Sequence, residues 1–241
     1  MSTNELLEGR WALILGASSG FGAATARALA AAGMNIFGVH LDTRATLPLA
    51  REVMADIEAT GHEAVYFNTN AADERKRNRT LDKIRDVLDQ DSADSIHMMV
   101  HSLAFGALRP FIADDPEEAT TETQMDMTLR VMGHSLVYWV QGLVQRDLLT
   151  RGSRIYSLSS AGSSRMMKNY GAVSAAKSAL ESHTRQLAME LAPRGICVNC
   201  LQPGVTDTPA LRAIPGYEEY IKRATEYNPG GRMTTPQDVA N

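Results

Sequence analysis

The sequence predicts one α/β domain, spanning residues 1–241, in which helices cover both faces of a doubly wound parallel sheet. Short apolar runs alternate with stretches of helix-forming composition along the chain. Such alternation is typical of parallel strands joined by right-handed helical crossovers. A chain of 241 residues, 44% of them hydrophobic, can also bury one sizeable core without disulfides.

The elements follow one another in a regular order. The expected strands are Trp11–Leu15, Met34–Leu41, Ala64–Phe67, Ile96–Val100, Arg154–Ser159 and Ile196–Leu201. The expected helices are Gly20–Ala32, Ala45–Thr60, Ala72–Asp89, Thr120–Thr150 and Ser174–Leu191. Residues Thr235–Asn241 have the composition of a helix start, with Pro236 in the first turn. We therefore expect a C-terminal segment of the domain to be absent from this sequence.

Composition and charge narrow the class of protein. The formal net charge of −4 gives no reason to expect nucleic acid as a partner. The chain has no apolar run of about 18 residues, and its start lacks the basic and apolar regions of a signal peptide, so we expect a cytoplasmic protein. Cys197 and Cys200 lie three apart on an expected strand and so point to opposite faces, which favours two buried thiols over a metal site.

A glycine-rich turn follows the first expected strand. Gly16, Gly20 and Gly22 lie in the segment GASSGFG, directly before an alanine-rich helix. Glycines allow a tight turn and a close approach to a pyrophosphate, whose charge the free amides of the helix N-terminus would stabilise. Although the spacing is not GxGxxG, the strand–turn–helix setting predicts a dinucleotide site.

From Trp11 to its last residue the chain resembles the short-chain dehydrogenase/reductase family, whose fold is a Rossmann-type sheet. The resemblance implies that Asn70 and Ala71 contact adenine and that the loop Pro203–Thr208 holds the nicotinamide amide. The full set of cofactor-binding residues that it implies is Gly16, Ser18, Ser19, Gly20, Phe21, Gly22, His40, Arg44, Asn70, Ala71, His101, Ser102, Lys177, Pro203, Gly204, Val205 and Thr208.

The choice of cofactor depends on the end of the second expected strand. His40 stands where the family places the acid that binds NAD, and a neutral imidazole cannot accept both ribose hydroxyls. Arg44 is close enough to meet a 2′-phosphate, which favours NADPH, with NADH as the other option. Asp42 would repel that phosphate if its side chain pointed inward.

Tyr170, Lys177 and Ser160 are the candidate catalytic residues. The family carries its tyrosine four residues before the lysine, but Val173 stands there and Tyr170 lies seven residues before Lys177. On one helix these two would share a face about 10 Å apart along the axis, with the ribose hydroxyls bridging them. The resemblance implies that Lys177 holds the ribose. Ser160 keeps the family's interval of 13 residues to Val173.

Other departures accompany the displaced tyrosine. The family's Asn-Asn-Ala-Gly is replaced by His101–Ala104, and its relay asparagine falls at Met132. A tyrosine seven residues before the lysine, and a segment such as Val100–Leu103, resemble the enoyl-acyl-carrier-protein reductase branch. The expected reaction is reduction of an enoyl thioester C=C bond by NAD(P)H in fatty-acid biosynthesis. A 3-oxoacyl or other carbonyl reductase, and a dinucleotide-binding sensor without turnover, remain the alternatives.

The segment between Thr208 and Tyr227 lies where the family has a lid over its substrate. Leu211, Ile214 and Tyr217 would give this lid an apolar inner face, suited to an acyl chain or to plain core packing. Leu103, Phe105, Met166 and Met167 are further apolar residues that could line an acyl pocket or simply pack in the core. Arg165 and Lys168 flank the entrance of this pocket, where they could contact an acidic acyl carrier protein or be solvated. The resemblance also implies a homodimer or homotetramer built partly from the helices Thr120–Thr150 and Ser174–Leu191.

Overall fold

A six-stranded parallel sheet forms the centre of the molecule, with strand order β3-β2-β1-β4-β5-β6. The computed structural model describes residues 6–91 and 95–241. The first five residues, which belong to the start expected to lack a signal region, lie outside the described residues. The strands are β1 Trp11–Leu15, β2 Asn35–His40, β3 Ala64–Asn68, β4 Ile96–His101, β5 Arg154–Leu158 and β6 Cys197–Leu201. The expected doubly wound sheet in a single domain is confirmed.

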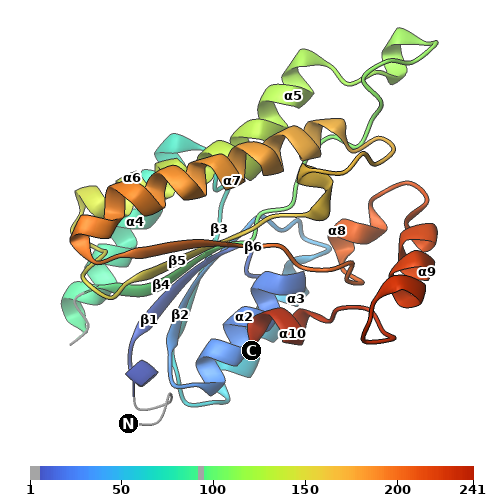
Figure 1. Cartoon of the computed structure of the whole chain (residues 1–241). Helices are drawn as coiled ribbons and strands as arrows, with labels where there is room; N and C mark the ends of the chain where they lie inside the picture. The colour runs from blue at the N-terminus through green and yellow to red at the C-terminus, as the bar shows by residue number, and fades with distance from the viewer. Residues whose placement is uncertain (1–5, 92–94) are drawn as a thin grey trace.

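Two layers of helix cover the sheet (Figure 1). The α-helices are α2 Gly20–Ala31, α3 Leu47–Glu58, α4 Glu74–Gln90, α5 Glu122–Leu129, α6 Ser135–Gln145, α7 Gly171–Leu191, α8 Pro209–Arg212, α9 Tyr217–Tyr227 and α10 Pro236–Ala240. Short 3-10 turns occupy η1 Pro116–Glu118, η3 Ala161–Ser163 and η4 Ala192–Arg194. Helices α4, α6 and α7 lie on one face of the sheet, and α2, α3 and α10 lie on the other (Figure 1).

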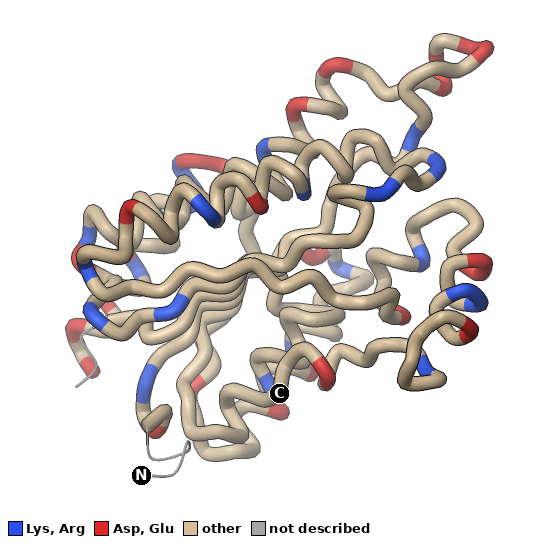
Figure 2. Tube along the Cα trace, in the orientation of Figure 1, with Lys and Arg blue, Asp and Glu red and all other residues tan. Residues whose placement is uncertain are grey.

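The sheet separates the two larger apolar clusters of the core. One gathers around Trp11, Trp139 and Leu180, between the sheet and the helices α4, α6 and α7. The other gathers around Ile14 and Ala26, on the side of α2 and α3. Among the six strands, Arg154 is the one Lys, Arg, Asp or Glu residue, so charge gathers on the outer helices and loops, as Figure 2 shows. Strands buried on both faces are expected in a parallel sheet.

The long helix expected over residues 120–150 is divided in three. It begins at Glu122 with a capping box between Thr121 and Gln124, and it ends at Gln145. A π-helical turn, η2, interrupts it at Arg130–His134. Extra residues of this kind are inserted into an α-helix where local packing demands it, which a composition pattern does not reveal.

Two further expectations differ from the structure, and a third is confirmed. Helix α7 begins at Gly171 rather than Ser174, so Tyr170 is the residue that precedes the helix and not part of it. Cys197 is exposed and Cys200 is half-buried, so the expectation of two buried thiols was wrong, because β6 is an edge strand. The expected terminal helix is present as α10, which Thr235 and Asp238 cap reciprocally.

No helix in the described residues is both long enough and apolar enough to span a bilayer.

Candidate functional site

The candidate site lies at the edge of the sheet where the parallel strands end. The register pairs Leu15 at the end of β1 with His101 at the end of β4, and His101 with Ser157 in β5. Loops that follow the strands therefore meet at this edge, which is where open α/β sheets bind ligands. The glycine turn, the segment after β4 and the loop after β5 all start here.

The glycine turn has the geometry of a cradle for a phosphate group. Gly16 has φ of +89°, and a Cβ on it would lie 2.5 Å from the carbonyl oxygen of Ser102. A Cβ on Gly22 would lie 2.1 Å from the carbonyl oxygen of Gly16. Ser19 precedes α2 without capping it through its side chain, so the first amides of the helix stay available to an anion. The residues present therefore fit a pyrophosphate, as a dinucleotide requires.

The loop after β6 lies against this turn. The side chain of Thr208 is buried, caps α8 by accepting from the amide of Leu211 at 3.2 Å, and lies 3.6 Å from the Cβ position of Gly20. Gly204 is exposed, and a Cβ on this glycine would lie 2.3 Å from the hydroxyl of Thr234. Pro203 and Val205 are half-buried in the same loop. The loop thus reaches the cradle, as the resemblance implies for a nicotinamide loop.

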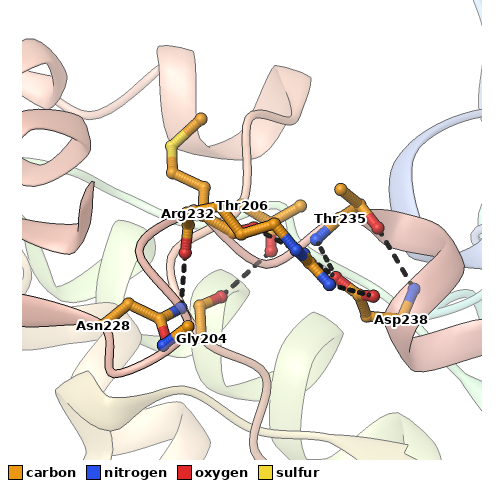
Figure 3. Close-up of polar contacts among 8 residues, drawn as sticks. Gly204, Thr206, Asn228, Arg232, Thr235 and Asp238 are labelled. Atoms are coloured by element: carbon orange, nitrogen blue, oxygen red, sulfur yellow. Dashed lines mark hydrogen bonds and ion pairs between the residues drawn. The ribbon is translucent and has the colours of Figure 1, made fainter.

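The segment after α9 closes over that loop. Arg232 forms a bidentate ion pair with Asp238, at 2.5 and 2.8 Å, and its carbonyl oxygen accepts from the side-chain amide of Asn228 at 2.6 Å. Figure 3 shows these contacts beside Gly204 and Thr206. Because α10 packs on α2, the ion pair ties residues 228–238 to the body of the domain.

Tyr170 and Ser160 bring two hydroxyl groups together. The phenol of Tyr170 donates to Oγ of Ser160 at 3.3 Å, and Oγ also accepts from the amide of Gly162 at 3.2 Å. The ring lies against the backbone of Gly162, where a Cβ would come within 2.4 Å of it. Burial raises the pKa of Tyr170, and the hydrogen bond with Ser160 partly opposes this. At neutral pH the group is a protonated phenol, able to donate.

Lys177 lies on α7 with its ammonium group buried among backbone oxygens. Its Nζ donates to the carbonyl oxygen of Leu158 at 2.5 Å and to that of Leu103 at 3.4 Å. Burial lowers its pKa to about 8, slightly opposed by Cys200. Tyr170 and Lys177 share no hydrogen bond, and their link is the short segment of α7 between them.

Val173 and Met132 stand where the family pattern has a tyrosine and an asparagine. Both lie in one apolar cluster with Tyr170. Both contact Gly106, since a Cβ there would lie 3.0 Å from the sulfur of Met132 and 3.0 Å from Cγ2 of Val173. Met132 lies within the π-helical turn η2. Val173, at the position where the family carries its tyrosine, is therefore tightly packed against apolar neighbours.

His101 does not face the cradle with its side chain. The imidazole is fully buried, with Nε2 2.7 Å from the hydroxyl of Ser135, while Nδ1 has no hydrogen-bond partner among the described residues. Burial, and secondarily the charge of Lys177, lower the pKa of His101 to about 3, so the ring is neutral. Its neighbour Ser102 donates its amide to Leu15 and reaches Gly16 with its carbonyl oxygen.

The adenosine side of the site differs from the expectation in detail. Asn70 accepts from the amide of Ala72 at 2.9 Å and so stabilises the local turn, whereas the carbonyl of Ala71 accepts from Trp139 on α6 at 2.9 Å. His40 is buried and its Nδ1 lies 2.7 Å from the carboxylate of Asp42. Arg44 is exposed and has no hydrogen bond or ion pair with any described residue.

Some of the residues expected to line an acyl pocket lie near Tyr170, and others lie elsewhere in the structure. Ile214 is buried in the cluster of Tyr170, with Leu211, Tyr217 and Met167 packed against it. Leu103 packs against the main core instead, and Met166 and Phe105 are exposed, the first fully and the second by 67%. Arg165 and Lys168 are both exposed on the loop between η3 and α7.

A separate hollow of about 610 Å³ lies away from this edge, over α4, α5 and α6. Arg77, Arg130, His134 and Tyr138 are among its lining residues. It contains none of the candidate catalytic or cofactor residues and has no part in the site.

Two features of the site could not be predicted from the sequence. One is the orientation of Asp42, which the sequence analysis names without a direction and whose carboxylate is little exposed and contacts His40. The other is the contact of His101 with Ser135, which is 34 residues distant and carries no sequence signal. Among the described residues, no group of three or more His, Cys, Asp or Glu side chains is placed to hold a metal ion.

Comparison with known proteins gives the family context. Residues 16–241 match the family model described as enoyl-(acyl carrier protein) reductase. The chain is 28% identical to the L-xylulose reductase of Bos taurus over 98% of this chain and 87% of that protein. It is also 28% identical to an NADH enoyl-acyl-carrier-protein reductase of Nostoc, over 98% of this chain and 88% of that protein.

Solved structures resemble the whole domain. A short-chain dehydrogenase from Burkholderia cenocepacia in complex with NADP has a TM-score of 0.79 and 27% identity, covering 97% of this chain and 88% of that chain. A dehydrogenase/reductase from Sinorhizobium meliloti has a TM-score of 0.82 and 26% identity, covering 99% and 88% of the two chains.

Proposed function

Because the chain belongs to the short-chain dehydrogenase/reductase family of NAD(P)(H)-dependent oxidoreductases, we propose that it reduces the C=C bond of an enoyl-acyl-carrier-protein thioester. The proposal rests on the position of Tyr170, whose phenol is buried in the site. Tyr170 precedes α7 and reaches Ser160, while Val173, three residues on, is packed against Gly106. The proton donor is thereby set back from its usual place in the family.

The displacement suits the chemistry of an enoyl thioester. When bound, the cofactor supplies the hydride, which in this reaction goes to the β-carbon of the substrate. Negative charge then develops on a carbonyl oxygen three bonds away, whereas in ketone reduction it develops on the atom bonded to the carbon that receives hydride. A shift of three residues along a helix corresponds to about 4.5 Å, the order of length required.

Each residue of the site has a role in this proposal. Tyr170, whose pKa burial raises, remains protonated and stabilises the enolate oxygen by donating a hydrogen bond in a water-poor environment. Ser160 holds that hydroxyl in place. Lys177 is already desolvated and fixed by two carbonyl oxygens, so its remaining N–H is available to the nicotinamide ribose.

The substrate side suits an acyl group. Leu211, Ile214 and Tyr217 bring the segment around α8 and α9 onto the apolar cluster that contains Tyr170. Such a surface would exclude water from the reacting atoms and contact an acyl chain. Arg165 and Lys168 are positive charges on the neighbouring loop, which suits an acidic acyl carrier protein and a place in fatty-acid synthesis.

Carbonyl reduction is the second candidate, and one contact favours it. The Ser160–Tyr170 pair is a serine and a tyrosine in hydrogen-bond contact, which could also polarise a ketone. L-xylulose reductase, a carbonyl-reducing relative by its name, is as similar in sequence as the enoyl reductase of Nostoc.

A pair of substrates separates the candidates. Oxidation of NADH and of NADPH is followed with a crotonyl thioester and with an acetoacetyl thioester. We expect turnover with crotonyl at least tenfold above that with acetoacetyl, and the reverse order would favour the carbonyl reductase. Binding of cofactor without turnover of either would indicate a sensor.

The same assay tests the role of Tyr170. Tyr170→Phe should lower crotonyl turnover by about 10²–10⁴-fold, the range for loss of a positioned proton donor. Tyr227→Phe, the same change at an 80% exposed residue, is the matched control. Unchanged turnover in Tyr170→Phe would remove this residue from the mechanism.

A further inference from the structure

We propose that Glu181 is a positioning residue for the reaction. Through Ser159 it holds the segment after β5 in place, so that the hydroxyl of Ser160 meets the phenol of Tyr170. The inference rests on the proposed function for the roles of Tyr170 and Ser160, but not on which thioester is reduced. Glu181 lies outside the set of residues that the sequence indicates for the site.

One face of α7 presents a row of polar side chains. Lys177, Glu181 and Thr184 follow Tyr170 by 7, 11 and 14 residues. At about 3.6 residues per turn these intervals are close to two, three and four whole turns, so the residues lie along one face. Helix α7 runs along β5 and β6 (Figure 1). The row therefore faces the end of β5.

Four consecutive residues at the end of β5 each contact one of these side chains. The pairs are Ser157 with Thr184, Leu158 with Lys177, Ser159 with Glu181, and Ser160 with Tyr170. The contacts thus fasten a whole segment of backbone to α7. Two of the four pairs contain the candidate catalytic residues, and the pair of Ser159 and Glu181 lies between them along β5.

Ser159 is fixed from two sides. Its amide donates to the carbonyl of Leu201 in β6 at 2.8 Å, and its hydroxyl donates to Oε1 of Glu181. The residue is only 7% exposed. Without the carboxylate, this buried hydroxyl would lose its acceptor, which favours a different local arrangement of the segment.

The carboxylate of Glu181 is committed to this contact. Among the residues that the structure describes, Ser159 is the one hydrogen-bond partner of the half-buried carboxylate, which forms no ion pair with them. A hydrogen bond from a hydroxyl to a carboxylate is stronger than one between neutral groups. Glu181 is therefore suited to hold the segment rather than to stabilise the surface by an ion pair.

The position of Ser159 decides that of the next residue. Oγ of Ser160 accepts from the phenol of Tyr170 at 3.3 Å and from the amide of Gly162 at 3.2 Å. The first distance exceeds the usual range of about 2.5–3.0 Å for two oxygens, so a small further displacement of the segment would break this contact. A proton donor that is misplaced by about 1 Å can lower turnover by about 100-fold.

Variants of Glu181 test the proposal, assayed with whichever of the crotonyl and acetoacetyl thioesters is turned over faster. Glu181→Ala should lower kcat by about 10–100-fold and leave KM for the thioester within about threefold, because the acyl contacts lie on other elements. Glu181→Gln retains an oxygen that accepts from Ser159 and should keep kcat within about threefold of wild type. Glu190→Ala, at an exposed residue of the same helix, is the matched control. Wild-type kcat in Glu181→Ala, or an equal loss in Glu181→Gln, would overturn the proposal.

Double variants test whether Glu181 acts through its neighbours. Ser159→Ala removes the same hydrogen bond from the other side, so Ser159→Ala/Glu181→Ala should lose no more than either single variant. In Tyr170→Phe, the change Glu181→Ala should alter kcat by less than about threefold, since the phenol that it positions is gone. Losses that multiply in both series would show that Glu181 acts elsewhere. If Glu181→Ala does not fold, Ser159→Ala gives the same test.

Hydrogen–deuterium exchange of the cofactor-free protein separates this inference from the proposed function. Exchange over residues 158–163 should be at least about tenfold faster in Glu181→Ala and Ser159→Ala than in wild type and Glu190→Ala. Unchanged exchange would overturn the inference even if Tyr170→Phe abolishes turnover. Full turnover in Tyr170→Phe would instead show that the proposed function fails at Tyr170, and the positioning role would fall with it.

Discussion

Met132 and Val173 both lie against Gly106: the sulfur of Met132 and Cγ2 of Val173 would each be 3.0 Å from a Cβ placed on this glycine. These are the positions at which the family carries an asparagine and a tyrosine. Their replacement by two apolar side chains that share one contact explains why the departures occur together. A polar group at either site would lie in a tightly packed apolar cluster without a partner.

A tyrosine at the family's usual position should not fit this chain. Val173→Tyr adds a ring to a position that already contacts Gly106, so we expect a loss of about 1–3 kcal/mol from overpacking, with no gain in ketone reduction. Urea denaturation measures the first effect and the acetoacetyl thioester assay the second. Met166→Tyr, at a fully exposed residue, should change stability by less than about 0.5 kcal/mol. An unchanged stability of Val173→Tyr would contradict the packing described.

The glycine turn should tolerate no side chain at Gly22. A Cβ there would lie 2.1 Å from the carbonyl of Gly16, so Gly22→Ala must displace the turn. We expect about 1–3 kcal/mol lower stability and at least a tenfold weaker binding of NADH in a calorimetric titration. Gly230→Ala is the control, because its Cβ would meet only the side chain of Asn228 at 3.4 Å. Normal cofactor affinity in Gly22→Ala would show that this turn does not hold the pyrophosphate.

His101 should make the protein sensitive to acid. Its pKa is about 3 in the folded chain, because the ring is buried, against the ordinary 6.5. Between these values the unfolded chain binds more protons, so stability falls as the pH is lowered from 6.5 toward 3. Urea midpoints measured from pH 7 to 4.5 should fall less steeply in His101→Gln than in the wild type. His62→Gln, outside the core, should retain the wild-type slope, and equal slopes in all three proteins would refute the prediction.

Lys177 should have an effect of the same sign on the alkaline side, so that stability again rises with pH. Burial lowers its pKa to about 8 from 10.5, so above pH 8 the unfolded chain keeps a proton that the folded chain has lost. This contribution raises the stability of the cofactor-free protein as the pH rises from 8 toward 9.5. Thermal unfolding of wild type and Lys177→Met should therefore diverge over this range, with the rise present in the wild type alone. Parallel curves would mean that the ammonium group is hydrated in solution.

The architecture and the cradle could be predicted from local patterns in the sequence. Alternating apolar runs place all six strands to within one residue at either end, because burial on both faces favours apolar residues in parallel strands. The turn at Gly16, Gly20 and Gly22 could be recognised since only glycine permits these backbone angles and close approaches. The helix over residues 120–150 was predicted as one piece, because the π-helical turn at Arg130–His134 depends on packing between helices.

The directions of the polar side chains of the site depend on the tertiary structure. From the sequence, Arg44 favours NADPH and Asp42 opposes it only if its side chain points inward; in the structure Asp42 is little exposed and contacts His40, while Arg44 is exposed. Asn68, which holds the backbone of Asp42 on both sides, comes from another part of the chain. The direction of a side chain depends on partners that are distant in sequence, so local patterns identify the residues of a site but not the charge that the site presents.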